Sequence, residues 1–188
     1  MKNIGTQVLE TERLILRPFV VNDAQAMFDN WAKSEHATRY VTWDPYTDAK
    51  EAVVRFEKMQ KEYAEKDIYD WAIVLKESNT LIGEISFVGM TPCRKTGELG
   101  YIIGENWWGK GYMTEAVGAV MAFGFTKLGL HRIQACHDVR NPASGRVMEK
   151  LGMTHEGTFR DYRLIKGDLV TVDYYAILED EFHPDQTK

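Results

Sequence analysis

Residues Glu98–Lys127 read ELGYIIGENWWGKGYMTEAVGAVMAFGFTK, and this stretch decides the fold. Its first part alternates, so Leu99, Tyr101 and Ile103 share one face of a predicted strand while Ile102 lies on the other. In its last part apolar residues recur at three- and four-residue steps, which is typical of a helix with one buried face. We therefore expect a strand that passes through a short turn directly into an amphipathic helix.

The turn contains Gly109 and Gly111 directly before the predicted helix. Glycines there let successive backbone N–H groups point outward at the positive end of the helix, where phosphate oxygens bind well. Two familiar phosphate motifs do not fit, because a Walker loop needs Ser or Thr after Lys110 and the dinucleotide fingerprint needs a glycine where Thr114 stands. The alternative is that the glycines only make a tight strand-to-helix turn.

Asn106, Gly109 and Gly111 resemble motif A of the GNAT superfamily of acetyl-CoA-dependent N-acetyltransferases, whose signature is Gln/Arg-x-x-Gly-x-Gly/Ala. Asn106 departs from that signature, so the contacts implied at this position are those of backbone N–H groups. The segment WWGKGYMTEA is similar to the RimJ/RimL-type branch of ribosomal-protein-alanine acetyltransferases. Similarity extends along most of the chain, through ERLILRPF, LIGEISF, NPASGRVMEKLGM, HEGTFRDY and YYAILEDEF.

The resemblance implies a GNAT-like fold of the α/β (α+β) class, with a mixed, mostly antiparallel sheet and helices on both faces. It also implies a central splay between two parallel strands, Glu98–Ile103 and Arg132–Asp138. One N-acetyltransferase domain is expected over residues 1–188, with an ordered core at about 8–182 and a tail at 183–188. The order of predicted elements agrees, because strands precede, interrupt and follow the helices.

The remaining elements follow from periodicity and from turn residues. Further strands are predicted at Thr11–Val20, Tyr69–Glu77, Thr80–Met90, His131–Val139, Met153–Tyr162 and Leu169–Glu179. Helices are predicted at Asp23–Lys33, from Ala49 onward and from Pro142 onward, with caps at Asn22, Asp48 and Asn141. Gly129 is expected to end the helix after Gly111, and Gly152 to end the helix that begins at Pro142. Hairpin turns are expected at Ser78-Asn79 and Lys166-Gly167-Asp168, and bulges or close backbone approach at Gly83 and Gly89.

The composition is typical of a globular protein and excludes other classes. Hydrophobic residues make up 44% of the chain and charged residues 27%, which excludes a wholly disordered protein. No apolar run is long enough to span a bilayer and Met1–Glu12 lacks the apolar core of a signal peptide, so a cytoplasmic protein without membrane partners is expected. The net charge of −5 argues against direct nucleic-acid binding, and Cys93 and Cys136 form no metal-spaced pair.

By resemblance, acetyl-CoA is the co-substrate and no metal takes part. The turn would hold the pyrophosphate, the splay would hold the pantetheine arm, and a backbone N–H near Ile102 or Ile103 would polarise the thioester carbonyl. The residues expected to bind the donor are Tyr101, Ile102, Ile103, Asn106, Trp107, Trp108, Gly109, Lys110, Gly111, Tyr112, Met113, Asn141 and Ser144.

The catalytic groups are inferred with alternatives left open. Many GNAT enzymes use a helical tyrosine for the leaving thiolate, but the matching position here is Met148, which cannot donate a proton. Ser144 becomes the candidate because the Rim-type branch carries Asn-x-x-Ser, and helix-start hydrogen bonding is its alternative role. For the base, Glu156 ranks first by resemblance, followed by Glu84, which is either a buried base or an edge-facing charge, and then by Glu98.

The predicted function is N-acetylation of a primary amine, with a protein N-terminal α-amine favoured by the branch resemblance. Two alternatives are a small-molecule amine, such as a polyamine, antibiotic or amino acid, and a non-catalytic acyl-CoA-binding sensor. The sequence is also compatible with a homodimer. The aromatic segment Thr38–Tyr46 either packs the early helices onto the sheet or lines the acceptor pocket.

Overall fold

The computed structural model describes residues 4–65 and 68–183, which form one eight-stranded sheet. The strands are β1 (Leu9–Glu10), β2 (Leu14–Arg17), β3 (Asp70–Leu75), β4 (Leu81–Thr91), β5 (Thr96–Ile103), β6 (Arg132–Asp138), β7 (Thr154–Ile165) and β8 (Asp168–Leu178). Their spatial order is β1-β2-β3-β4-β5-β6-β8-β7, and all neighbours are antiparallel except β5 and β6. The predicted mixed, mostly antiparallel sheet is confirmed.

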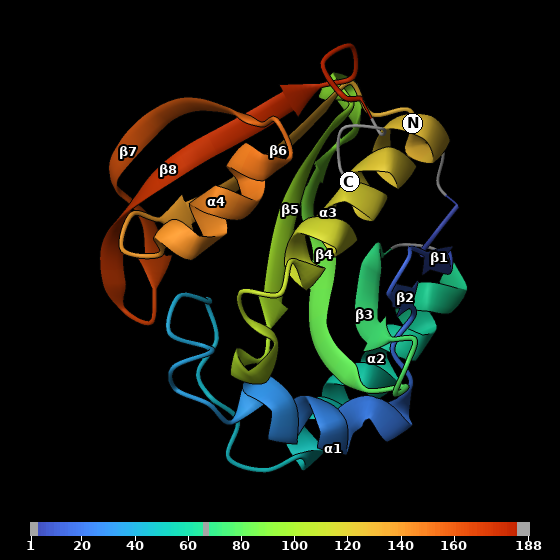
Figure 1. The fold of residues 1–188 in the computed structure, drawn as a ribbon. Coiled ribbons are helices and arrows are strands. Elements are labelled where there is room, and N and C mark those ends of the chain that lie inside the picture. Colours follow the sequence, from blue (N-terminus) through green and yellow to red (C-terminus); the bar gives the residue numbers. More distant parts are fainter. Residues whose placement is uncertain (1–3, 66–67, 184–188) are drawn as a thin grey trace.

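Helices cover both faces of this sheet (Figure 1). The α-helices are α1 (Ala24–Met27), α2 (Lys50–Glu65), α3 (Tyr112–Phe123) and α4 (Pro142–Lys150). Helices α3 and α4 share a core with Leu99, whereas α1 and α2 share the opposite core with Ile102. The predicted alternation of β5 is therefore confirmed. Among the described residues, no helix is both long and apolar enough to cross a membrane.

The start of the first helical region differs from its prediction. The expected helix Asp23–Lys33 is divided into a 3-10 turn, α1 and a single π turn. Asn22 is not its cap: Val20 holds the cap position of the 3-10 turn, and its backbone N–H donates to the carboxylate of Asp23 at 2.9 Å. Arg17 holds the same carboxylate with a donor–acceptor distance of 2.7 Å, and this ion pair fixes Asp23 as the capping side chain.

The other predicted helix ends are confirmed with one exception. Asp48 Oδ1 accepts a hydrogen bond at 2.8 Å from the backbone N–H two residues on, and Gly129 and Gly152 adopt φ of 70° and 76° after their helices. Asn141 occupies the cap position of α4, but its side chain makes no capping hydrogen bond. Instead its backbone carbonyl accepts from the N–H of Ser144 at 3.2 Å.

Both predicted hairpins are present. The β3–β4 turn contains Asn79 at φ 52°, and the β7–β8 turn contains Lys166 and Gly167 at φ 50° and 88°. Of the predicted tail at 183–188, residues 184–188 lie outside the described residues. Strand β7 continues beyond the predicted end at Tyr162, so the second hairpin is longer than the sequence pattern indicates.

Strands β5 and β6 pair with each other only over their first halves. The parallel ladder begins with Thr96 opposite Arg132 and ends with Leu99 opposite Ala135, although both strands run on beyond this point. Figure 1 shows the two halves of the sheet meeting near the top of the view and parting below. The predicted splay is confirmed, and it leaves the ends of β5 and β6 facing an opening.

Two glycines shape β4 where it pairs with β5. A register shift lies beside Gly89, and another lies beside Gly83 in the β3–β4 ladder. A Cβ added at Gly83 would lie 2.4 Å from the carbonyl oxygen of Ile102, whereas one at Gly89 would lie 3.7 Å from the Cβ of Glu98. Gly83 therefore permits β4 to approach the end of β5 closely, as one of the two sequence interpretations proposed.

We expect Gly83→Ala to lower the free energy of unfolding by about 1–3 kcal/mol, because the added methyl group must displace the backbone of β5. Gly89→Ala is the matched control, since it changes the same strand where the methyl group has room, and its effect should stay within about 0.5 kcal/mol. Urea unfolding followed by tryptophan fluorescence measures both. Equal stabilities of the two variants would contradict the close approach.

Candidate active site

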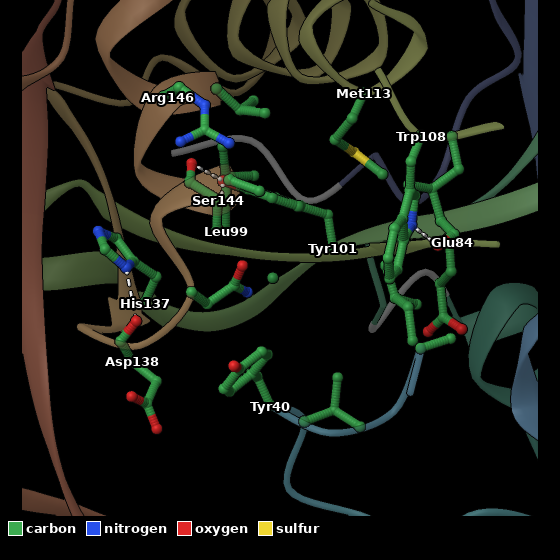
Figure 2. Close-up of a pocket in the computed structure, with 18 of the residues that line it drawn as sticks. Tyr40, Glu84, Leu99, Tyr101, Trp108, Met113, His137, Asp138, Ser144 and Arg146 are labelled. Atoms are coloured by element: carbon green, nitrogen blue, oxygen red, sulfur yellow. Dashed lines mark hydrogen bonds between the residues drawn. The ribbon is translucent and has the colours of Figure 1, made fainter. Parts of the chain in front are cut away.

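A cavity of about 770 Å³ occupies the splay between β5 and β6. Figure 2 shows Leu99 and Tyr101 at its centre, Ser144 on the side of α4, and Glu84 at the opposite end. Because its lining includes both Tyr101 and Ile102, which lie on opposite faces of β5, the cavity is open to both faces of the sheet. A ligand on one face can therefore meet a ligand on the other.

The turn before α3 forms one wall, and its backbone suits an anion. Gly109 and Gly111 have φ of 73° and 81°, in the left-handed region that favours glycine. Gly111 is also the N-cap of α3, so the first N–H groups of this helix lack the side-chain acceptor that a Ser or Asp cap would supply. Those donors lie at the positive end of the helix, where a phosphate is favoured.

Arg13, directly before β2, braces this turn from outside the cavity. Its Nη1 donates to the carbonyl oxygen of Lys110 at 3.0 Å, and its guanidinium lies 4.5 Å from the centre of the Tyr112 ring. Glu115, in the first turn of α3, accepts from Arg13 Nε and from the Thr11 hydroxyl, both at 2.6 Å. Burial alone would raise the pKa of Glu115, but these hydrogen bonds lower it overall. The N-terminal segment therefore fixes the shape of the turn.

Most of the residues expected to bind the donor line this cavity. They are Tyr101, Ile102, Ile103, Trp107, Trp108, Gly109, Gly111, Tyr112, Met113, Asn141 and Ser144. Asn106 and Lys110 are not part of the lining, so the structure does not bring these two side chains to the site. Trp108 Nε1 donates to the carbonyl of Ile103 at 2.8 Å, which holds the turn against the end of β5.

Ser144 lies in the first turn of α4, and its hydroxyl faces β5 across the splay (Figure 2). Ser144 Oγ donates to Tyr101 Oη at 3.0 Å, and Tyr101 Oη donates to the Ser144 carbonyl at 3.1 Å. Burial raises the pKa of Tyr101 well above its ordinary value, although the bond to Ser144 works in the other direction. Met148 is buried in the core and is not part of the lining, so it leaves the thiolate role to other groups.

Glu156 is not brought to the cavity. It lies in the register irregularity between His155 and Gly157 of β7, and its carboxylate accepts from Arg132 Nη1 at 2.7 Å. The hydrogen bond from Arg132 lowers the pKa of Glu156 more than burial raises it, which makes this carboxylate a weaker base. The structure therefore argues against Glu156, the first-ranked base, because the bulge directs it to Arg132 and away from the splay.

Glu84 lines the cavity but is held in an ion pair. Its carboxylate accepts from Arg55 Nη1 at 2.9 Å, and Arg55 Nη2 also lies 3.3 Å from the carboxylate of Asp70. Burial, and after it the neighbouring Glu84 carboxylate, raise the pKa of Asp70, which shares Arg55 with Glu84. Neither sequence interpretation of Glu84 anticipated this pairing.

Several lining residues were not found by sequence reasoning. Arg163 reaches the cavity from β7 and is bonded to Glu98, the third-ranked base, which also accepts from Gln134 Nε2 at 2.9 Å. Arg146 and Lys150 line the cavity from α4, and neither has an ion-pair partner within residues 4–65 and 68–183. The sequence feature that could have identified these two cations is their i,i+4 spacing, which places both on one face of the helix that follows the predicted splay.

The aromatic segment between α1 and α2 packs the early helices as predicted and also lines the cavity. Tyr40 and Trp43 line the cavity, and the Tyr40 hydroxyl donates to the carbonyl of Arg140 at 3.1 Å. Trp43 and Tyr46 also pack against the core of α1 and α2, with ring centres 5.2 Å apart. The segment is therefore both a packed element and a wall of the cavity.

The split sheet and the glycine turn at the splay leave space and backbone donors for an acyl donor, and comparisons with known proteins identify the family. Residues 13–154 match the acetyltransferase (GNAT) domain family, so this chain belongs to the GNAT acetyltransferases. The uncharacterized N-acetyltransferase p20 of Bacillus licheniformis is 33% identical over 176 residues, which cover 94% of this chain and 98% of p20. The protein is therefore an enzyme, and the interpretation as a non-catalytic sensor is set aside.

Two further comparisons place it within the family. The ribosomal protein uS5-alanine N-acetyltransferase of Escherichia coli (strain K12) is 28% identical over 171 residues, covering 88% of this chain and 87% of that protein. The crystal structure of a GNAT-family acetyltransferase from Bacillus anthracis superposes with a TM-score of 0.81 at 29% identity, covering 93% of this chain and 100% of that one.

We expect Gly111→Val to weaken acetyl-CoA binding about tenfold or more, because valine resists the left-handed backbone that presents the N–H groups. Gly129→Val is the matched control. Gly129 has φ of 70° just beyond α3, and a Cβ there has nothing within 4 Å, so the variant carries similar strain away from the cavity. Isothermal titration calorimetry measures the Kd of both. A parent-like Kd in folded Gly111→Val would remove the anion-binding role of the turn.

Proposed function

We propose that this enzyme transfers the acetyl group of acetyl-CoA to the N-terminal α-amine of a protein. The observation that carries the proposal is the single cavity that joins the anion-binding turn before α3 to the opposite face of the sheet. A thioester held from one face and an amine arriving from the other can meet beside the unpaired end of β5. The 28% identical relative named for uS5-alanine acetylation supports a protein acceptor.

The chain offers three sets of groups for the donor. The N–H groups of the turn at Gly109 and Gly111 suit the pyrophosphate, and the unpaired end of β5 suits the amide-bearing pantetheine arm. Acetyl-CoA carries a third phosphate on its ribose. Arg146 and Lys150 are cations in the cavity wall without ion-pair partners among the described residues, and we assign them to that phosphate.

Acetyl transfer forms a C–N bond and breaks the C–S bond, whose electron pair leaves with sulfur. A backbone N–H near Ile102 or Ile103 receives the developing oxyanion, and we assign Ser144, a hydroxyl in the cavity wall, to the leaving thiolate. An ordinary α-amine has a pKa of about 7.7–8.0, so it needs little help to lose its proton. Glu84, and Glu98 after it, are the carboxylates on the acceptor side that pass this proton to solvent through water.

A small cationic amine is the second candidate acceptor. Glu84, Ser86 and Trp43 belong both to the main cavity and to an adjoining cavity, where Asp70 and Tyr46 are also part of the wall. A second amino group of such a molecule could pair with Asp70 while the first is acetylated. This observation keeps polyamines in the acceptor screen.

The test is thiol release from acetyl-CoA with peptides that begin with Ala, Ser or Met, compared with polyamines, aminoglycosides and amino acids. We expect turnover with peptides that have a free α-amine, rising from pH 6 to about 8 as the amine is deprotonated. The same peptides with a blocked N-terminus and an internal lysine are the matched control and should not react. If the enzyme acetylated polyamines and none of the peptides, the acceptor would be a small molecule and not a protein.

Replacing both Arg146 and Lys150 by alanine should weaken acetyl-CoA binding about tenfold or more, since two charge-assisted contacts are lost. Binding of acetyl-dephospho-CoA, which lacks the ribose 3′-phosphate, should not change. Lys127→Ala is the control because Lys127 is an exposed cation of the region after α3 that does not line the cavity. Equal losses for both donors would show that the two cations do not contact the 3′-phosphate.

A further inference from the structure

Two hydroxyl groups meet where the sheet parts. Tyr101 lies two residues beyond Leu99, the last residue of β5 that pairs with β6, and its side chain reaches across to the first turn of α4. There it accepts a hydrogen bond from Ser144 Oγ and donates one to the Ser144 carbonyl, at 3.0 and 3.1 Å. Figure 2 shows this pair in the wall of the cavity.

We propose that Tyr101 is a positioning residue for the leaving group: with Ser144 it forms a two-hydroxyl site that stabilises the CoA thiolate. This inference rests on the proposed function and assigns Tyr101 a role beyond donor contact. It also explains how the protein can carry Met148 at the helical position where many GNAT enzymes have a tyrosine. Here Tyr101 of β5 supplies a phenol beside the start of α4.

The need for a second hydroxyl follows from the observed bonds. A serine hydroxyl has one hydrogen, and that of Ser144 is directed to Tyr101. When Ser144 turns this hydrogen toward sulfur, the phenolic hydrogen of Tyr101 can turn from the Ser144 carbonyl to Ser144 Oγ, since Tyr101 Oη lies 3.1 Å from the first oxygen and 3.0 Å from the second. A hydroxyl that accepts a hydrogen bond donates more strongly, so Tyr101 strengthens the contact between Ser144 and sulfur.

The surroundings of Tyr101 fit hydrogen bonding without proton loss. Its ring packs against the core that contains α3 and α4, which fixes the direction of the hydroxyl. Burial raises the pKa of the phenol, so it stays protonated at neutral pH. The C–S bond breaks with its electron pair on sulfur, and sulfur finally takes the proton that the amine has released to solvent. Neither hydroxyl changes its protonation state over the reaction.

The direct test is the pKa of the thiol of CoA bound to the enzyme, measured from thiolate ultraviolet absorbance against pH with the desulfo-CoA complex as blank. We expect this pKa to lie below that of free CoA and to rise by about 1 unit in both Tyr101→Phe and Ser144→Ala. Tyr175→Phe is the matched control, because Tyr175 donates to Glu149 of the same helix at 3.2 Å but does not line the cavity. An unchanged thiol pKa in Tyr101→Phe overturns the inference.

Kinetics give the second readout. In single-turnover reactions with a verified acceptor, Tyr101→Phe should slow acetyl transfer about tenfold and leave the Kd of acetyl-CoA within about twofold. The double variant Tyr101→Phe/Ser144→Ala should be no slower than Ser144→Ala, since Tyr101 acts through Ser144. Losses that multiply would overturn the inference. A shifted thiol pKa in an enzyme that acetylates no amine would refute the proposed function and leave the two-hydroxyl site standing.

Discussion

The early end of pairing between β5 and β6 is the constraint on which the rest of the site depends. A broken ladder leaves backbone donors and acceptors without their usual partners, which is costly unless water or a ligand supplies them. The break persists because each strand is fixed on its other side, β5 by β4 and β6 by β8. The two cores on opposite faces hold these half-sheets in place. The opening is thus maintained by packing around it and not by flexibility.

Contacts between distant parts of the chain then complete the walls of the opening. Arg13 bonds the turn before α3, and Tyr101 bonds the start of α4. The segment after α1 is tied to the second half of the chain, because Tyr40 donates to the carbonyl of Arg140 and Lys166 Nζ donates to the carbonyl of Thr38 at 2.9 Å. These bonds join the two half-sheets through loops where the strands themselves have parted.

The carboxylates show where sequence reasoning reached its limit. Glu156 ranks first as the base by resemblance, and Glu84 and Glu98 follow because they stand on strands near the predicted splay. Their roles depend on which arginine each one meets, namely Arg55, Arg163 and Arg132. Glu156 lies at a register shift in β7, which determines the residues that its side chain meets. The sequence pattern does not reveal such a shift in a strand whose residues are mostly exposed. The choice of Asp23 over Asn22 as a cap has the same origin in a partner, Arg17.

The sequence by itself determined the strand, turn and helix at the centre of the fold, the alternation of β5 and the glycines that end the helices. These features depend on local periodicity and on backbone angles that few residues adopt, so neighbouring residues suffice to predict them. The tertiary structure alone decided which side chains reach the opening. The Tyr101–Ser144 bond spans 43 residues of sequence and the Arg13–Glu115 pair spans 102. A local sequence pattern does not predict contacts between residues so far apart. These contacts exist only because α3 packs across the sheet against β2 and because α4 begins beside the end of β5.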